Sequence, residues 1–281
     1  MKRFSTTLCL LILSAITISY AQISMPQPSP LSTVSQKVGL ADVTVTYSRP
    51  SVKGRKIFGD LVPYNTIWRT GANAPTKISF SDSVTVAGKV LAPGDYALYT
   101  IPGEKEWTVI FGKDASLQAG SHKDGEEAAK FKVNPVKTCA HVETFTIDFN
   151  DVTPSSAVIA ISWADTKVSF KVENAYDHKV MAEIKQKTAG AADAMTYYQA
   201  ASYYYETNRD LKQALEWVNK ATENDPKFWQ LHTKAKIQAK LNDCKGAIET
   251  ANKSIELAKA AGNDQYVKFN EQLIAECKKK K

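Results

Sequence analysis

Between about residues 36 and 172, apolar and polar residues alternate in short runs that are separated by turn residues. Val43, Val45 and Tyr47 alternate with threonines, and Ile78 and Phe80 repeat the pattern. A period of two predicts β-strands that bury one face. Eight to ten short strands at this spacing are typical of an antiparallel sandwich or barrel, and we predict a β-sandwich over residues 36–174.

The second half of this region sets the expected strand boundaries. We expect Asp165 and Thr166 to form the last turn, and residues 114–128 to form a polar loop leading into a short helical turn. The later strands are expected at Lys130–Val133, His141–Phe149, Ala157–Trp163 and Lys167–Val172.

The pattern changes near Ala175, where Ala, Lys, Glu, Gln and Leu begin to recur at helical spacing. Small and aromatic residues then repeat with an offset of about 33 residues, which resembles a tetratricopeptide array. We therefore predict an α+β multidomain chain, with a small tetratricopeptide-like α-solenoid at 175–281 and a capping helix at 264–279. The repeat positions are Tyr198, Ala201, Ser202, Tyr205, Ala214, Val218, Ala221 and Pro226, and then Leu231, Ala235, Gln238, Ala247, Ala251 and Ser254.

The expected turns between helices lead to a hypothesis about two cysteines. Turns are expected at residues 208–210 and 242–243, and residues 261–263 should turn helix 244–260 back into helix 264–279. Cys244 then lies 17 residues before residue 261, and Cys277 lies 16 residues after it. A disulfide between Cys244 and Cys277 is geometrically possible, and the alternative is two unpaired buried thiols.

The N-terminus has the features of a secretory signal. Lys2 and Arg3 precede an apolar run from Leu8 to Ile18, and small residues come before Gln22. This arrangement predicts a cleaved signal peptide at 1–21 and a periplasmic or secreted protein. A proline-rich leader is expected at 22–35, and no later run is apolar enough for a membrane span.

The charge excludes one class of partner. The chain carries a net charge of +7, but residues 22–176 contain 16 basic and 15 acidic residues. The excess in residues 177–281 comes from the terminal run Lys278–Lys281. A nucleic-acid-binding domain carries a basic face, so we predict no nucleic-acid partner.

The segment 49–73 concentrates chemistry-bearing residues without a helical or strand-like period. We therefore expect an ordered loop, which is where proteins often place binding residues. Guanidinium groups bind carboxylate, phosphate or sulfate, and tyrosine and tryptophan stack on rings. The candidate ligand-binding residues are Arg49, Arg55, Tyr64, Trp68, Arg69 and Asn73.

Each of these residues also has a structural alternative. The arginines could pair with carboxylates such as Asp42, Asp60 or Asp95 and fasten the loop to the sheet. Tyr64 and Trp68 could form a lid over one end of the sandwich, because aromatic rings bury large apolar areas.

The same segment carries a family resemblance. Tyr47-Ser48-Arg49-Pro50, residues 57–64, the run from Trp68 to Asn73 and Trp107-Thr108-Val109-Ile110-Phe111 together resemble domain-of-unknown-function family 2911. The resemblance covers about residues 29–172 and implies a secreted bacterial β-domain that is often followed by tetratricopeptide-like helices. It implies no activity, because none is established for the family. This sequence departs from the family pattern at Gly112 and at Ala119-Gly120.

Signatures of catalysis are weak. The sequence has no GxSxG, HExxH, P-loop or GxGxxG motif. Cys139 and His141 share one face of an expected strand, and His122 with Asp124 and Glu126 could hold a metal, but such neighbours are common by chance. We predict no catalytic residue, no metal and no cofactor.

Three functional hypotheses remain open. The first is an exported, non-enzymatic binding module that holds a glycan, peptide or phosphate at residues 49–73, with helices that dock to the sandwich or to a protein partner. The second is an envelope or carbohydrate-active hydrolase with a dispersed active site. The third is a structural envelope protein.

The aromatic residues of the helical region could form a surface for a protein partner, or they could fill the core of the helical region.

Overall fold

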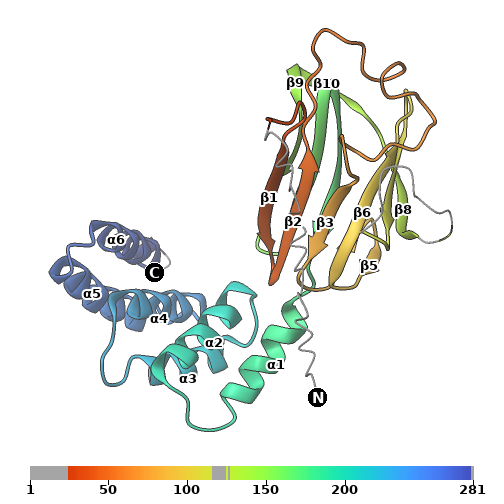
Figure 1. Cartoon of the computed structure of the whole chain (residues 1–281). Coiled ribbons are helices and arrows are strands. Elements are labelled where there is room, and N and C mark those ends of the chain that lie inside the picture. Colours follow the sequence, from red (N-terminus) through yellow and green to blue (C-terminus); the bar gives the residue numbers. More distant parts are fainter. Residues whose placement is uncertain (1–24, 116–124, 126, 280–281) are drawn as a thin grey trace, which may run out of the picture. The chain divides into compact units, whose positions relative to one another are not determined.

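The computed structural model describes residues 25–115, 125 and 127–279. The chain divides into two compact units, one that ends at Ala175 and one that begins at Tyr176 (Figure 1). The expected signal peptide, the weak metal-binding candidates His122, Asp124 and Glu126, and the departure at residues 119–120 lie outside the described residues.

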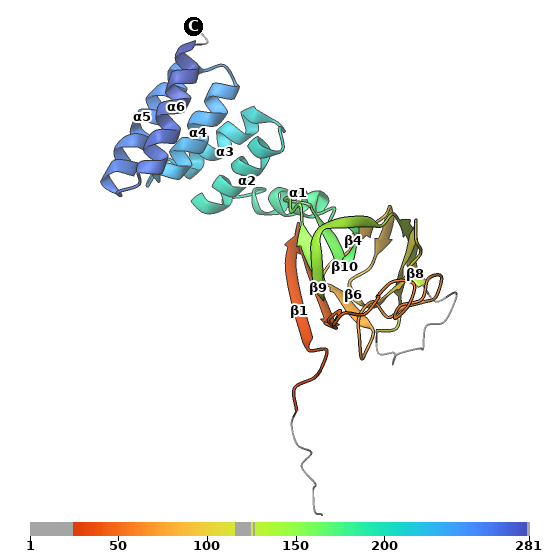
Figure 2. The ribbon, with the colours of Figure 1, turned by 90° about the horizontal axis from the view of Figure 1, so that it is seen from above.

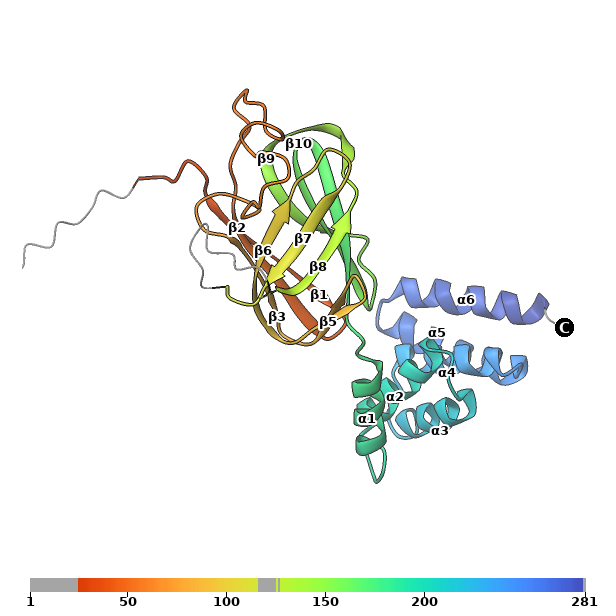
Figure 3. The same ribbon diagram turned by 90° about the vertical axis from the view of Figure 1, so that its right-hand side faces the viewer.

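Strands of the first unit form two antiparallel sheets. A six-stranded sheet has the order β1-β2-β3-β6-β7-β8, and a four-stranded sheet has the order β5-β4-β10-β9. The predicted antiparallel two-sheet domain is therefore confirmed (Figures 1 and 3). The strands are β1 Leu31–Val38, β2 Ala41–Ser48, β3 Thr76–Phe80, β4 Val84–Val86, β5 Lys89–Leu91, β6 Gly94–Ile101, β7 Trp107–Gly112, β8 Glu127–Val133, β9 Val136–Asn150 and β10 Ser156–Glu173.

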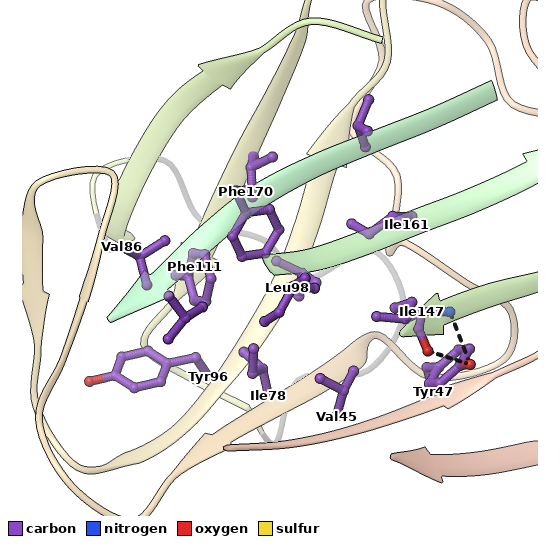
Figure 4. Close-up of a cluster of buried hydrophobic side chains, with 14 of the residues drawn as sticks. Val45, Tyr47, Ile78, Val86, Tyr96, Leu98, Phe111, Ile147, Ile161 and Phe170 are labelled. Carbon is purple, nitrogen blue, oxygen red and sulfur yellow. Dashed lines mark hydrogen bonds between the residues drawn. The ribbon is translucent and has the colours of Figure 1, made fainter. Parts of the chain in front are cut away.

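The core lies between the inner faces of the two sheets. Along β2, Val43, Val45 and Tyr47 are buried, while the residues between them are more exposed, as the period of two predicts. The Tyr47 hydroxyl donates a hydrogen bond to the Ile147 carbonyl and accepts one from the Ile147 amide, both at 3.0 Å (Figure 4). This pair of bonds joins β2 to β9, so the hydroxyl is satisfied inside an apolar core.

Three expected strand boundaries are wrong. The expected turn at Asp165-Thr166 does not form, because β10 runs unbroken through it. At these polar residues, β-bulges shift the pairing register between β10 and the long strand β9, and Ala164 adopts a φ of 51°. The strand β1 begins at Leu31, inside the expected leader, because pairing with all of β2 compensates for its weak apolar alternation. The strand β8 begins at Glu127 rather than Lys130, because it pairs with β7 as far as Gly112.

The predicted ordered loop joins β2 to β3 and crosses one end of the β-domain, drawn orange-brown in Figures 1 and 2. Its ends are tied to neighbouring strands rather than to each other. The Val52 amide donates to the Glu143 carbonyl at 2.8 Å, and Trp68 and Thr100 exchange two backbone hydrogen bonds of 2.7 and 2.9 Å. These backbone bonds place the side chains of the loop against β9 and β6.

The second unit is helical, as expected, and consecutive helices pack against one another from α2 onward. The expected helices at 244–260 and 264–279 are confirmed. Asn208 and Asn242 adopt φ values of 55° and 65° in the expected turns, and Asp210 and Asp243 then cap the next helices. The helices are α1 Asp177–Lys187, α2 Ala194–Glu206, α3 Leu211–Ala221, α4 Phe228–Lys240, α5 Cys244–Ala260 and α6 Asp264–Lys279.

Two further expectations concern the cysteines and the membrane. Cys244 and Cys277 lie on the consecutive helices α5 and α6, and a disulfide between them stays a prediction. Cys277 is buried and Cys244 is half-buried.

Over the described residues, every helix is too short or too polar to cross a bilayer.

Candidate functional site

A cavity of about 250 Å³ lies under the β2–β3 loop, and four large side chains define its chemistry. Arg55, Trp68 and Arg69 come from the loop, and Trp163 comes from the irregular part of β10. We call this space the arginine–tryptophan cavity. Its lining contains two guanidinium groups and no carboxylate. Of the three candidate arginines, Arg55 and Arg69 line this cavity and Arg49 does not.

The tryptophan rings form a fixed wall of this cavity. Trp68 and Trp163 stack with their centroids 5.9 Å apart and their planes inclined by 16°. Trp68 Nε1 donates a hydrogen bond to the Gly71 carbonyl at 3.0 Å. A Cβ on Gly71 would lie 3.2 Å from both the Ser48 carbonyl oxygen and Thr76 Oγ1. Glycine therefore lets the loop approach β2 closely, and this approach keeps the Trp68 ring in place.

Two buried donors in the cavity have no partner. Arg69 Nε and Trp163 Nε1 are both inaccessible to solvent, and neither makes a hydrogen bond within the described part of the chain. A buried donor without an acceptor costs about 1–3 kcal/mol, and folded proteins rarely leave such groups unpaired. Arg69 and Trp163 both line the cavity, but these two nitrogens lie beneath its accessible surface.

The second arginine of the cavity is held by the loop itself. Arg55 donates from Nε to the Val52 carbonyl at 3.0 Å and from Nη2 to the Ser51 carbonyl at 2.6 Å. These bonds involve no carboxylate, so the positive charge of the exposed Arg55 side chain is not neutralised by them. The cavity is therefore lined by two guanidinium-bearing residues whose charge no carboxylate of the lining balances.

Two of the predicted site residues are structural instead. Arg49 does not line the cavity, because its Nε donates to the Phe145 carbonyl at 3.0 Å and its Nη2 donates to Thr146 Oγ1 at 2.8 Å. The Asn73 side-chain amide donates to the Ser29 carbonyl and to Ser48 Oγ, both at 3.2 Å. Arg49 ties the loop to β9, and Asn73 ties it to the chain before β1.

The expected acidic partners of the arginines are also wrong. Asp42 pairs with Lys37 at 2.8 Å, and Asp95 pairs with Lys77 at 3.2 Å. A hydrogen bond with Ser79 lowers the pKa of Asp95 most, and the hydrogen bond from Lys77 lowers it further. Among the ion pairs of the described residues, none involves Arg49, Arg55 or Arg69.

Tyr64 lines a different cavity, of about 280 Å³, which we call the tyrosine cavity. Phe58 and Trp107 contribute their rings to its wall, and Glu104 and Asp165 contribute carboxylates. The Tyr64 ring lies so close to Gly59 that a Cβ there would be 2.6 Å from Tyr64 Cε2. The predicted set of six residues is therefore divided between two cavities and two structural anchors.

The weak catalytic candidates do not come together. His141 Nδ1 lies 3.1 Å from Asp165 Oδ1, and its Nε2 lies 3.6 Å from Glu143 Oε2. Cys139 on the same strand is exposed, and no contact between it and His141 is found. Over the described residues, no group of three or more metal-binding side chains is found.

Sequence reasoning missed Trp163. It lies 95 positions after Trp68 in the chain, and it looked like one more alternating core residue of a strand. Its neighbours Asp165 and Thr166 did interrupt that strand pattern, and this interruption is the signal that could have singled it out.

Comparison with known proteins assigns the β-domain and nothing more. The family described as "Protein of unknown function (DUF2911)" matches residues 29–172, which is half of the chain, so the chain belongs to this family. No curated protein and no solved structure matches the chain.

Proposed function

We propose that this DUF2911 protein is an exported, non-enzymatic binding module that holds a polar or anionic ligand in the arginine–tryptophan cavity. The observation that supports this function most directly is that Arg55 and Arg69 line one cavity to whose wall no carboxylate contributes. A guanidinium can donate several N–H groups to the oxygens of an anion. The charge of Arg55 would attract the ligand to the same place.

The helical unit has a separate part in this proposal. Its repeat of small and aromatic positions and its Asp-capped helices support a tetratricopeptide-like array, a class of fold whose stacked helices bind proteins on extended surfaces. The helices would dock to the β-domain or to a protein partner. Export rests on the signal-like sequence at 1–21, and an N-terminal sequence that begins at Gln22 in protein recovered from the periplasm or medium would support it.

The binding function is tested by comparing two arginines of the same loop. A thermal-shift screen of phosphates, carboxylates, glycans and peptides is run on the wild-type chain and on Arg69→Met and Arg49→Met. We expect at least one anionic compound to raise the Tm of wild type and of Arg49→Met, and to lose this effect in Arg69→Met. An unchanged response of Arg69→Met to every binding compound would contradict the proposed site.

A second candidate function is hydrolysis of a glycan in the tyrosine cavity. It is favoured by the two carboxylates, Glu104 and Asp165, that line this cavity beside aromatic rings. Turnover of a cell-wall or storage glycan that is abolished in both Glu104→Gln and Asp165→Asn would support it. Turnover that survives both substitutions would exclude these residues.

A further inference from the structure

The helical unit contains a pocket of about 220 Å³ between α1 and α2, which lie side by side in Figures 1 and 3. Val180 and Ile184 line it from α1, four residues apart and thus on one face of that helix. Thr196, Ala200 and Tyr203 line it from α2 at intervals of four and three residues, which likewise places them on one face. The faces of two helices therefore point into one space, which we call the α1–α2 pocket.

The α1–α2 pocket is held open by hydrogen bonds at the two ends of α1. At the start of the helix, Asp177 Oδ1 accepts from the Tyr203 hydroxyl and from Arg209 Nη2, both at 2.5 Å. Beyond its last turn, the Tyr197 hydroxyl donates to the Gly190 carbonyl at 3.1 Å. Between these two ties, no residue of α1 is buried. The middle of α1 therefore stands away from α2, and the pocket exists before a ligand arrives.

The hydroxyl groups of the lining are already used. The Thr188 hydroxyl donates to a carbonyl of its own helix at 2.8 Å, and the Thr196 hydroxyl donates to Asp193 Oδ2 at 2.8 Å. The Tyr203 hydroxyl is the donor to Asp177. An acceptor atom of a ligand would therefore find no free hydroxyl donor in the α1–α2 pocket.

The charges of the lining cancel each other. Glu183 and Lys187 both line the pocket, and they pair with each other at 2.6 Å. A charged ligand would leave water without an unpaired opposite charge to meet, which is costly. Val180 and Ile184 are half-buried, so an apolar ligand that covers them would be bound favourably.

We infer that the α1–α2 pocket binds a small uncharged molecule whose body is apolar, of the size of one aromatic ring or a short alkyl chain. The apolar body packs between Val180, Ile184 and Ala200. Gln199 lines the same pocket and is exposed, so its amide meets a single polar group of the ligand at the rim. An apolar cavity of about 150 Å³ holds one benzene ring, so about 220 Å³ suits a ring with one substituent. This site lies wholly within the helical unit and is independent of the anion proposed for the β-domain.

The test uses the full chain, with the methyl groups of valine and isoleucine labelled for NMR. Three compounds share one ring and differ in charge: benzyl alcohol is neutral, benzoate is an anion and benzylammonium is a cation. Glucose serves as an uncharged ligand with a polar body. We expect benzyl alcohol to shift the Val180 and Ile184 methyl signals saturably, and the other three to bind there at least about ten-fold more weakly.

Val180→Trp supplies the matched variant, because its ring fills the pocket from a helix that buries none of its residues. Ala182→Trp makes a similar change at an exposed position of α1 that does not line the pocket. We expect the Ile184 methyl response to benzyl alcohol to be lost in Val180→Trp and kept in Ala182→Trp. Thermal unfolding shows whether each variant is folded. If Val180→Trp does not fold, Gln199→Trp fills the pocket from α2, with the same loss expected.

Each outcome bears on one part of the inference. Equal binding of benzyl alcohol and the two charged compounds would overturn the selection of an uncharged ligand. An unchanged Ile184 response in the pocket-filling variant would show that the compound binds elsewhere and would overturn the site. Absence of any Val180 or Ile184 shift with benzyl alcohol would overturn the inference altogether, and the proposed anion site in the β-domain would be unaffected.

Discussion

Two sets of buried polar groups, one in each unit of this protein, are treated in opposite ways. In the helical unit, His232 Nδ1 lies 2.9 Å from Asn270 Oδ1, and Asn270 Nδ2 donates to Ser254 Oγ at 2.8 Å. Ser254 Oγ in turn donates to the Phe228 carbonyl at 2.6 Å. Because the amide oxygen of Asn270 can only accept, the chain of bonds places the proton of His232 on Nδ1.

In the β-domain, Arg69 Nε and Trp163 Nε1 are buried without any such chain. A closed network satisfies its polar groups and holds helices together, whereas the two orphaned donors of the β-domain remain a cost to folding. Other buried atoms without partners occur in the helical unit, on Ser202, Arg209 and Gln238. Ser202 lies on α2, Arg209 lies between α2 and α3, and Gln238 lies on α4. None of them lines the arginine–tryptophan cavity or the tyrosine cavity.

The largest effect is expected from opening the closed network. Asn270 is fully buried, so Asn270→Leu leaves His232 and Ser254 without their shared partner. We expect a loss of about 3 kcal/mol in the free energy of unfolding, measured by urea denaturation of the helical transition. Asn252→Leu, at an exposed position of α5, is the control and should change stability by less than about 0.5 kcal/mol. Equal effects of the two variants would contradict a structural role for the network.

The next largest effect distinguishes a satisfied arginine from an unsatisfied one. Arg49→Met removes two charge-assisted hydrogen bonds to β9 and should cost about 2 kcal/mol of stability. Arg69→Met removes a guanidinium for which no hydrogen bond is found among the described residues, and should not lower stability by more than about 0.5 kcal/mol, because the desolvation cost of the buried Nε is removed with it. Urea denaturation of the β-domain measures both. A larger loss for Arg69→Met than for Arg49→Met would reverse their assigned roles.

A smaller effect concerns the position of Tyr64. Gly59 and Gly54 both have positive φ, at 81° and 70°, but only at Gly59 would a Cβ meet another group, the Tyr64 ring. We expect Gly54→Ala to cost about 1 kcal/mol and Gly59→Ala about 1 kcal/mol more, because the ring must also move. Thermal unfolding of the two variants gives this difference. Equal losses would mean that Tyr64 is not held by Gly59.

The smallest effect is on pH dependence. Burial lowers the pKa of His232 below 6.5, the charge of Lys236 lowers it further, and the hydrogen bond with Asn270 raises it. The folded state thus binds a proton less readily than the unfolded state. Stability of the helical unit is therefore full above about pH 6.5 and falls as the pH drops from there through the lower pKa of the folded state.

Urea denaturation at several pH values between 8 and 5 checks this sign. His232→Gln cannot titrate, so it should reduce the fall in stability toward acidic pH. A variant with the same pH dependence as wild type would show that other groups cause the fall.

The amino-acid sequence by itself determined the features that depend on neighbouring residues. The period of two predicted an antiparallel β-sandwich or barrel, and the domain has two antiparallel sheets. The residues at 208–210 and 242–243 predicted turns between helices, and Asp210 and Asp243 cap the helices that follow. The helices at 244–260 and 264–279 followed from local composition and turn residues. Family membership also followed from a compact set of motifs, because it depends on residue identity alone.

The tertiary structure alone decided the roles of the candidate site residues. Arg49 and Arg69 are equivalent in the sequence, but Arg49 donates to the Phe145 carbonyl, 96 residues away, whereas no acceptor for the Arg69 side chain is found among the described residues. Trp163 reaches Trp68 only because bulges in β10 adjust its pairing with β9. Hydrogen-bond partners and cavities depend on which distant segments pack together, and local patterns carry no direct record of that packing.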